Sequence, residues 1–172
     1  MGCIPSKSSG NGVTVLDCLF FPEHGQQNLA SIVKYLDAAR TSIDACVFTI
    51  TENQIAKALI RAKKRGVAVR VVTDNDKVND IGSDIHQLQQ AGIPVRVDNS
   101  PAHMHHKFCI IDNKILLNGS FNWTHAASTQ NRENVVVCDA GGMISPFNKE
   151  FQKLWKEFAH NKLAAEEHHN RL

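Results

Sequence analysis

Two polar side chains that could do chemistry together, His105 and Lys107, precede a short apolar run in the middle of this chain. Residues two apart in an extended segment share one face, so the imidazole and the ammonium point the same way. A second apolar run follows Asp112-Asn113, a pair typical of tight turns. The pattern predicts a β-hairpin that carries both groups at its open end.

Three polar residues at and beyond the second predicted strand, Asn118, Ser120 and Asn122, are also spaced two apart. The hairpin is expected to set this row beside His105 and Lys107. An imidazole, an ammonium, a hydroxyl and amides would then converge at one end of an otherwise apolar sheet. Because unpaired burial of such groups is costly, we expect the cluster to serve a ligand.

Phosphodiester hydrolysis is the chemistry that suits this set. An imidazole can attack phosphorus and form a covalent intermediate, and a lysine and an amide can hold the phosphate oxygens as charge builds. A purely structural role for His105 is the alternative. A zinc site at His103, His105 and His106 is disfavoured, because the ammonium of Lys107 would repel the cation. We therefore expect no metal and no cofactor.

The full pattern resembles the HKD signature of the phospholipase D superfamily. The matching residues are H-x-K-x4-D at His105, Lys107 and Asp112, G-S-x-N at Gly119, Ser120 and Asn122, and the trailing Glu133. The resemblance implies that His105 is the nucleophile and that Lys107, Ser120 and Asn122 hold the phosphate. It also implies that Glu133 hydrogen-bonds the imidazole of His105. Asp112, at the turn, and Gly119 are expected to have structural roles.

This chain carries one full signature, whereas the superfamily brings two together within one chain or across a two-fold dimer. The resemblance therefore implies a homodimer with one composite site. The His105 of one copy would attack phosphorus, and that of the other would protonate the leaving oxygen.

Within the superfamily, the sequence resembles most the single-signature cardiolipin hydrolases, the Zucchini-like group. This resemblance favours a phospholipid substrate such as phosphatidylcholine or cardiolipin. An endonuclease for single-stranded RNA or DNA is the alternative, since the basic cluster of Lys57, Arg61–Arg65 and Arg70 would serve a nucleic-acid backbone. A non-catalytic dimer that only binds phosphates is a second alternative. Trp123 could line the pocket, stack on a base or pack in the core.

The amino terminus matches a lipidation pattern. Gly2 and Ser6 fit the myristoylation motif, and Cys3 is a natural palmitoylation site. Two lipids would hold the protein firmly at the cytoplasmic face of a membrane. The resemblance points to the mitochondrial outer membrane instead. We expect no transmembrane segment, because the apolar run 13–21 is too short.

Length and patterning predict one α/β domain, a mixed sheet between helices in a chain of 172 residues. Residues 1–12 are expected to be flexible, 13–160 to form the domain and 161–172 to be a polar tail. The five cysteines are scattered and suggest a reducing compartment. Predicted strands are 13–21, 42–50, 67–73, 93–97, 108–111, 115–117 and 134–138; predicted helices are 28–39, a helix capped by Thr51 that ends at 65, 83–91, and a last helix capped by Ser145.

Overall fold

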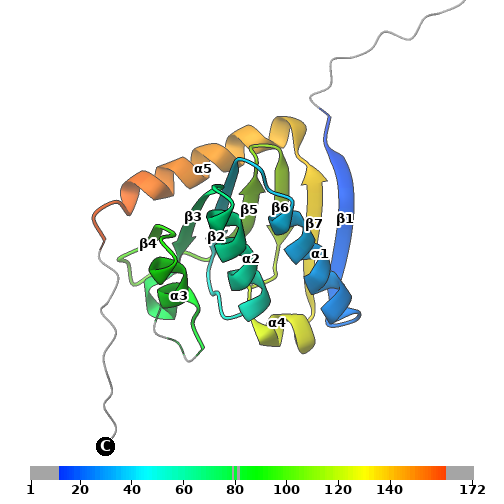
Figure 1. Ribbon diagram of the computed structural model, residues 1–172, viewed down its shortest axis with the longest axis horizontal. Helices are drawn as coiled ribbons and strands as arrows, with labels where there is room; N and C mark the ends of the chain where they lie inside the picture. The colour runs from blue at the N-terminus through cyan, green and yellow to red at the C-terminus, as the bar shows by residue number, and fades with distance from the viewer. Residues whose placement is uncertain (1–11, 79, 81, 162–172) are drawn as a thin grey trace, which may run out of the picture.

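A seven-stranded mixed sheet lies at the centre of the fold (Figure 1). The computed structural model describes residues 12–78, 80 and 82–161. The strands are β1 (Thr14–Phe21), β2 (Ser42–Val47), β3 (Ala68–Thr73), β4 (Val95–Val97), β5 (Lys107–Ile111), β6 (Ile115–Gly119) and β7 (Glu133–Asp139). Their order is β1-β7-β6-β5-β2-β3-β4. β2, β3 and β4 run parallel because helices connect them, and the other pairs are antiparallel.

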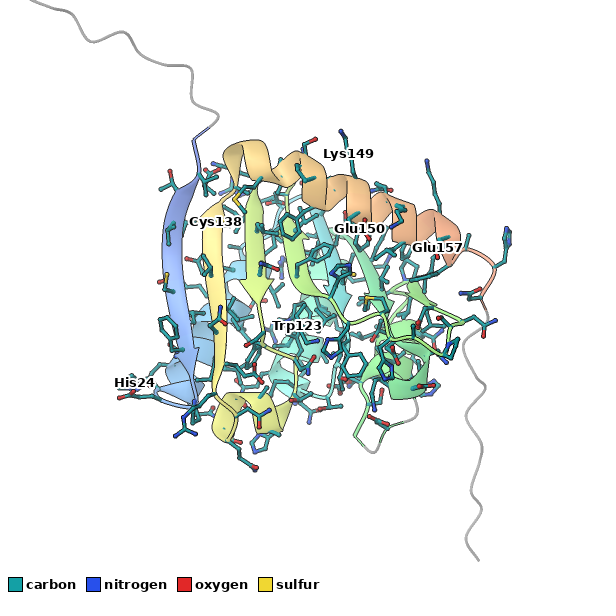
Figure 2. The ribbon with its side chains drawn as sticks, turned by 180° about the vertical axis from the view of Figure 1, so that it is seen from behind. His24, Trp123, Cys138, Lys149, Glu150 and Glu157 are labelled. Atoms are coloured by element: carbon teal, nitrogen blue, oxygen red, sulfur yellow. The ribbon has the colours of Figure 1, made fainter. Side chains whose placement is uncertain are left out.

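Helices cover both faces of this sheet, as the sequence predicts. Helices α1, α2 and α3 lie on one face (Figure 1), and α5 crosses the other (Figure 2). The helices are α1 (Gly25–Asp37), α2 (Asn53–Lys64), α3 (Ile85–Gln90), α4 (His125–Thr129) and α5 (Ile144–Glu157). Two 3-10 turns, η1 (Asn75–Lys77) and η2 (Gly141–Met143), complete the described elements.

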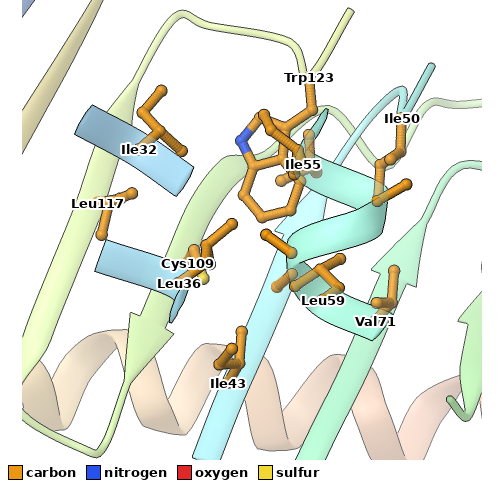
Figure 3. Close-up of a cluster of buried hydrophobic side chains, with 14 of the residues drawn as sticks. Ile32, Leu36, Ile43, Ile50, Ile55, Leu59, Val71, Cys109, Leu117 and Trp123 are labelled. Atoms are coloured by element: carbon orange, nitrogen blue, oxygen red, sulfur yellow. The ribbon is translucent and has the colours of Figure 1, made fainter. Parts of the chain in front are cut away.

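A large apolar core fills the space between the sheet and helices α1 and α2 (Figure 3). Leu36 of α1 and Leu59 of α2 are fully buried there, and so are Ile43 and Cys109 on the strands below. Trp123 is only 4% exposed and packs in the same core. Of the three predicted uses of Trp123, core packing is therefore the one found.

A second core lies between the sheet and α5. Phe151 and Leu154 of α5 pack with Phe108 and Ile110 of β5, and all four are buried. These helix residues belong to the apolar stripe that predicts the last helix. Burying one such side chain contributes roughly 1.5–3 kcal/mol, so the stripe holds α5 on the sheet.

The helix starts differ from the prediction: α1 begins at Gly25 and not at residue 28, and α3 begins at Ile85 and not at residue 83. Glu52, rather than Thr51, caps α2, and its side chain accepts a hydrogen bond from the backbone N–H of Gln54 (3.2 Å). α5 begins at Ile144 directly after η2, with no side-chain cap, so the predicted Ser145 cap is wrong. The short helix α4, capped by Thr124, lies in a segment predicted as a loop. Local patterns locate helices better than the residues that begin them.

The turn of the β5–β6 hairpin is tied to the start of β2 by Asp112. Asp112 and Asn113 both have φ of 53°, a left-handed conformation that Asp and Asn tolerate. The carboxylate of Asp112 accepts the backbone N–H groups of Arg40 (3.0 Å), Thr41 (2.7 Å) and Ser42 (3.0 Å). One side chain thus joins segments 70 residues apart.

Asp112→Ala is expected to lower the free energy of unfolding by about 3 kcal/mol, because three N–H groups lose a charged acceptor. Partial burial raises the pKa of Asp112, but the N–H groups of Ser42, Thr41 and Arg40 outweigh it and lower the pKa overall. In the wild-type protein, the stability that Asp112 contributes should be fully present above the ordinary carboxyl pKa. It should be lost as the pH falls through the lowered pKa of the folded state. Urea unfolding at pH 7 and pH 3 measures both; equal losses at the two pH values would contradict the reasoning.

Asp84 is a buried acid with the opposite pH behaviour. Burial raises its pKa to about 6, and the Glu52 carboxylate adds to the rise. Its Oδ2 is buried and has no hydrogen-bond partner among the described residues. The folded state therefore binds more protons than the unfolded chain between about pH 4 and pH 6, and stability falls as the pH rises through this range.

Asp84→Asn is expected to raise the free energy of unfolding by about 2 kcal/mol at pH 7.5, because the buried charge is removed. The gain should fade at pH 4, where Asp84 is protonated in the wild-type protein. Denaturant midpoints at the two pH values provide the measurement. A gain of the same size at pH 4 would show that the charge is not the cause.

Cys18, Cys46, Cys109 and Cys138 are free thiols in the described part of the chain. Within residues 12–161, apart from 79 and 81, no helix has the length and apolar character needed to span a membrane.

Candidate active site

The predicted site residues gather at one end of the sheet, where β2 and β6 end and β5 and β7 begin. Lys107 begins β5 and His105 lies two residues before it, Ser120 follows β6, and Glu133 begins β7. β6 pairs antiparallel with both β5 and β7, which brings these strand ends together. Residues up to 28 positions apart in the sequence thus meet at one edge.

The register of the hairpin differs from the predicted polar rows. Phe108 pairs with Asn118, and directly paired residues of antiparallel strands point to the same face. Asn118 therefore lies on the face opposite to that of Lys107, and the prediction that they share a face is wrong. Ile111 pairs with Ile115 across the turn. This pairing sets the register, and a shift of one residue moves a side chain to the other face.

His105 offers an exposed imidazole held against an aromatic ring. Its ring centroid lies 4.7 Å from that of Phe48. Partial burial lowers the pKa of His105, and the positive charges of Lys107 and His103 lower it further. The neutral form of the imidazole, which can act as a nucleophile, is therefore favoured near neutral pH.

Lys107 is half-buried beside this imidazole. Its Nζ donates a hydrogen bond to the backbone carbonyl of His105 (2.8 Å) and lies 5.0 Å from the ring centroid of Phe48. Burial lowers the pKa of Lys107, and the negative charge of Glu133 opposes this. An ammonium fixed in this way can face an anionic ligand without rearranging.

Ser120 and Glu133 form a hydrogen-bonded pair on the other side of the site. The hydroxyl of Ser120 donates to Oε2 of Glu133, and the side chain of Asn131 donates to Oε1 (3.3 Å). The backbone N–H of Asn134 in turn donates to the Ser120 hydroxyl (3.1 Å). The orientations of Ser120 and Glu133 are thus mutually determined.

The hydrogen bond expected from Glu133 to the imidazole of His105 is not found among the described residues of this single chain. β6 lies between β7, which carries Glu133, and β5. Neighbouring strands are about 4.8 Å apart, so two such spacings separate the two strands. Ser120, at the end of the intervening strand, takes the place of His105 as the partner of the carboxylate.

Asn122 lies in a segment that is fastened to the end of β2. The backbone N–H of Trp123 donates to the carbonyl of Thr49 (3.1 Å). The carbonyl of Trp123 accepts a hydrogen bond from the backbone N–H of Thr51 (2.8 Å). The side-chain Oδ1 of Asn122 is buried and has no hydrogen-bond partner among the described residues. The amide nitrogen is the donor that Asn122 could offer to a ligand.

A family described as "Cardiolipin synthase, PLD-like domain" matches residues 32–155 of the chain, which contain all of these site residues. This protein belongs to the phospholipase D-like family. The match covers most of the described domain and both halves of the HKD signature.

Individual relatives agree with this assignment. The chain is 47% identical over 135 residues to a mitochondrial cardiolipin hydrolase of Chlamydomonas reinhardtii, and 43% identical over 135 residues to that of Homo sapiens. These matches cover 78% of this chain but only 60% and 54% of the two relatives. The phospholipase D family member Nuc from Salmonella typhimurium is 34% identical, with a TM-score of 0.76 over 84% of this chain and 95% of its own.

The glycine of this phospholipase D-like signature has a steric reason. A Cβ atom added at Gly119 would overlap the backbone carbonyl of Asn134 on the adjacent strand. Only glycine allows β6 and β7 to approach this closely beside the Ser120–Glu133 pair.

Two residues of this phospholipase D-like site, Phe48 and Asp74, are not among the sequence-predicted ones. Asp74 is fully buried, and its Oδ2 accepts the N–H of Met104 (3.0 Å) and lies 3.2 Å from Nδ1 of His103. It thereby holds the segment that leads into His105. Asp76 brings a third potential metal ligand within 4.8 Å of the other two. Phe48 directly follows β2, and Asp74 directly follows β3, at the same edge of the sheet. A polar or aromatic residue at the end of an apolar strand is the sequence signal that could have identified them.

Two hollows flank the phospholipase D-like signature residues. One, of about 250 Å³, is lined in part by His103, His105 and Phe158. The other, of about 760 Å³, is open and lined in part by Phe20, Arg132 and Glu133. A ligand bound at the signature residues therefore has space on either side.

Proposed function

We propose that this protein is a phospholipase D-type phosphodiesterase that hydrolyses phospholipids through a covalent phosphohistidine at a homodimer interface. The juxtaposition of an exposed imidazole, that of His105, with the fixed ammonium of Lys107 supports this function above all. Binding of phosphate alone would not need a neutral imidazole beside the cation. Family membership supports the same reaction class.

The reaction proceeds in two balanced steps. An imidazole nitrogen of His105 attacks phosphorus, a P–N bond forms, and the P–O bond to the leaving alcohol breaks. The partner subunit's His105, protonated, gives its proton to the leaving oxygen. Water then attacks phosphorus, the P–N bond breaks, and the partner's imidazole takes the proton from water. Lys107 and Asn122 donate to the phosphate oxygens in both steps, and Ser120 donates once its hydroxyl turns from Glu133 to the phosphate.

An uncovered face of the sheet supports the homodimer. Beyond α5, the strands β1 and β7 have no helix over them on the side seen in Figure 2. Phe20 is 64% exposed, and Cys18 pairs with the exposed Val136 on this surface. The surface continues to Asn134, which pairs with Phe20 and directly follows Glu133 of the site. A second copy seated there would cover apolar area next to the catalytic residues.

The two hollows support a substrate with two bulky arms. The hollow lined by Phe20 and Arg132 offers an exposed aromatic ring and a cation near Glu133. A phospholipid, with its diacylglycerol arm on one side of the phosphate and its head group on the other, matches this layout. The relatives named cardiolipin hydrolases lead to the same substrate class and to a mitochondrial membrane.

Single-stranded nucleic acid is the second candidate, because Phe20 and Arg132 could also stack a base and bind a phosphate. The predicted basic cluster gives it less support. Arg61 forms an ion pair with Asp37 (2.7 Å), and Arg70 forms one with Asp44 (2.7 Å). These cations are therefore partly neutralised, and Arg70 lies on a different face from α2.

Attachment to a membrane by acylation of Gly2 and Cys3 remains a prediction from the sequence, since both residues lie outside the described part of the chain. Such lipids would hold the site near phospholipid substrates at the cytoplasmic face of a membrane.

A substrate comparison tests the proposed function. The purified full-length protein is incubated with vesicles of phosphatidylcholine or cardiolipin and, separately, with labelled single-stranded RNA and DNA, each with and without EDTA. We expect hydrolysis of vesicles, unchanged by EDTA, and a ³²P label on His105 after acid-free quenching with a labelled phospholipid. Size-exclusion chromatography with light scattering should give the mass of a dimer.

The other outcomes each point elsewhere. Cleavage of strands but not vesicles would replace the phospholipid proposal with the nuclease. Binding of both without cleavage would identify a non-catalytic phosphate-binding dimer. Loss of hydrolysis in EDTA would contradict a mechanism that uses only side chains of the protein.

A further inference from the structure

Phe48 lies at the centre of the charged and nucleophilic groups of the site. Its ring centroid is 4.7 Å from that of His105 and 5.3 Å from that of His103. The Nζ atoms of Lys107 and Lys77 lie 5.0 and 5.5 Å from the same centroid. One aromatic ring thus contacts two imidazoles and two ammonium groups that come from separate segments of the chain.

The backbone on either side of this ring is held firmly. The N–H of Phe48 donates to the carbonyl of His106 (2.9 Å), which extends the β2–β5 ladder by one bond. The carbonyl of Phe48 accepts from the hydroxyl of Thr73 (3.1 Å), a residue with no solvent exposure. The position of the Cα atom of Phe48 is therefore fixed, and the ring packs against its neighbours from that position.

The ring acts differently on the two signature residues. An ammonium within about 6 Å of an aromatic centroid is attracted by the negative ring face, so Lys107 is drawn to Phe48. Its Nζ simultaneously donates to the carbonyl of His105, which limits the positions open to the ammonium. The imidazole of His105 packs against the same ring, which restricts its rotation although the residue is exposed.

We propose that Phe48 is a positioning residue that holds the His105 nucleophile and the Lys107 ammonium at a fixed separation before a phosphodiester arrives. This inference rests on the proposed function and adds a residue outside the HKD signature to it. Phe48 acts through the two signature residues, so its loss should lower kcat more than it changes KM. A displacement of about 1 Å at a reacting group can cost on the order of a hundredfold in rate.

Removal of the ring should also change the titration of His105. Partial burial lowers the pKa of His105, and the surrounding charges modify that shift. With leucine at position 48, water and a mobile Lys107 replace a packed ring and a fixed cation, so the pKa of His105 should rise towards its ordinary value. The groups whose charges act on His105 are Lys107, His103 and His106, which lower its pKa, and Asp74, which raises it.

Phe48→Leu keeps most of the apolar volume and removes the aromatic face, and Phe147→Leu is the matched control. Phe147 is also a half-buried aromatic residue, but it packs on Phe108 under α5 (5.0 Å between centroids). We expect Phe48→Leu to lower kcat on the preferred phosphodiester about 10- to 30-fold with KM changed less than threefold. In Phe147→Leu, kcat should stay within twofold of the wild-type value.

Histidine titration by NMR with ¹³C-labelled imidazoles supplies a readout independent of activity. The His105 midpoint should rise in Phe48→Leu, and the acidic limb of the kcat/KM profile should rise with it. Phe48→Met serves as a second variant if the leucine protein does not fold. An unchanged kcat together with an unchanged His105 midpoint would overturn the positioning role while leaving the proposed function intact. If the wild-type protein hydrolyses no phosphodiester, the proposed function fails, and the positioning role of Phe48 fails with it.

Discussion

His105→Ala is expected to lower kcat for phosphodiester hydrolysis by on the order of 10⁴-fold or more, as deletion of a nucleophile does in other covalent enzymes. The imidazole is exposed and its pKa is lowered, so the wild-type group can attack near neutral pH. In a dimer with a composite site, the same substitution removes both the nucleophile and the acid. Steady-state kinetics on the preferred substrate and loss of the ³²P label would measure the two consequences together.

The neighbouring His106 provides the control. It is also exposed, but its Nε2 lies 3.7 Å from Glu150 of α5, and its ring contacts Phe108 on the α5 side (5.5 Å between centroids). His106→Ala should keep kcat within about threefold of the wild-type value and should still accept the label. A loss of less than tenfold in His105→Ala, with the fold intact by circular dichroism, would end the assignment of His105 as the nucleophile.

Lys107→Gln is expected to lower kcat by about 10²- to 10³-fold, the usual effect of removing one preorganised donor from a developing anion. The Nζ of Lys107 is held by the His105 carbonyl and by the face of Phe48, so the charge is oriented before the substrate binds. Glutamine keeps a donor but is shorter and uncharged. KM should also rise, because the phosphate already carries negative charge in the ground state.

Lys114→Gln is the matched control for this substitution. Lys114 follows the turn at the opposite end of the hairpin and pairs with Asp139 (3.3 Å). Its loss should leave both kcat and KM within about twofold of the wild-type values. Comparable losses in the two variants would mean that the overall positive charge, and not the position of Lys107, supports catalysis.

The sequence by itself determined the local parts of this protein. Alternating and 3.6-residue apolar patterns located all seven strands and four of the five described helices. Such patterns are local, because the residues on the buried face of a strand or helix recur at a fixed spacing along the chain. The spacing of His105 and Lys107 followed from strand geometry, and the Asp112-Asn113 turn from the backbone preferences of those residues. Their match to the phospholipase D signature rested on the same short-range spacings.

Only the tertiary structure decided which side chains meet across strands. Because β6 lies between β7 and β5, Glu133 accepts a hydrogen bond from Ser120 and not from His105. The register of the hairpin places Asn118 on the face opposite to that of Lys107. Phe48 comes beside His105 because β2 pairs with β5, two segments more than 50 residues apart. Strand order and register depend on the packing of the whole sheet between its two cores, and no local spacing in the sequence carries that information.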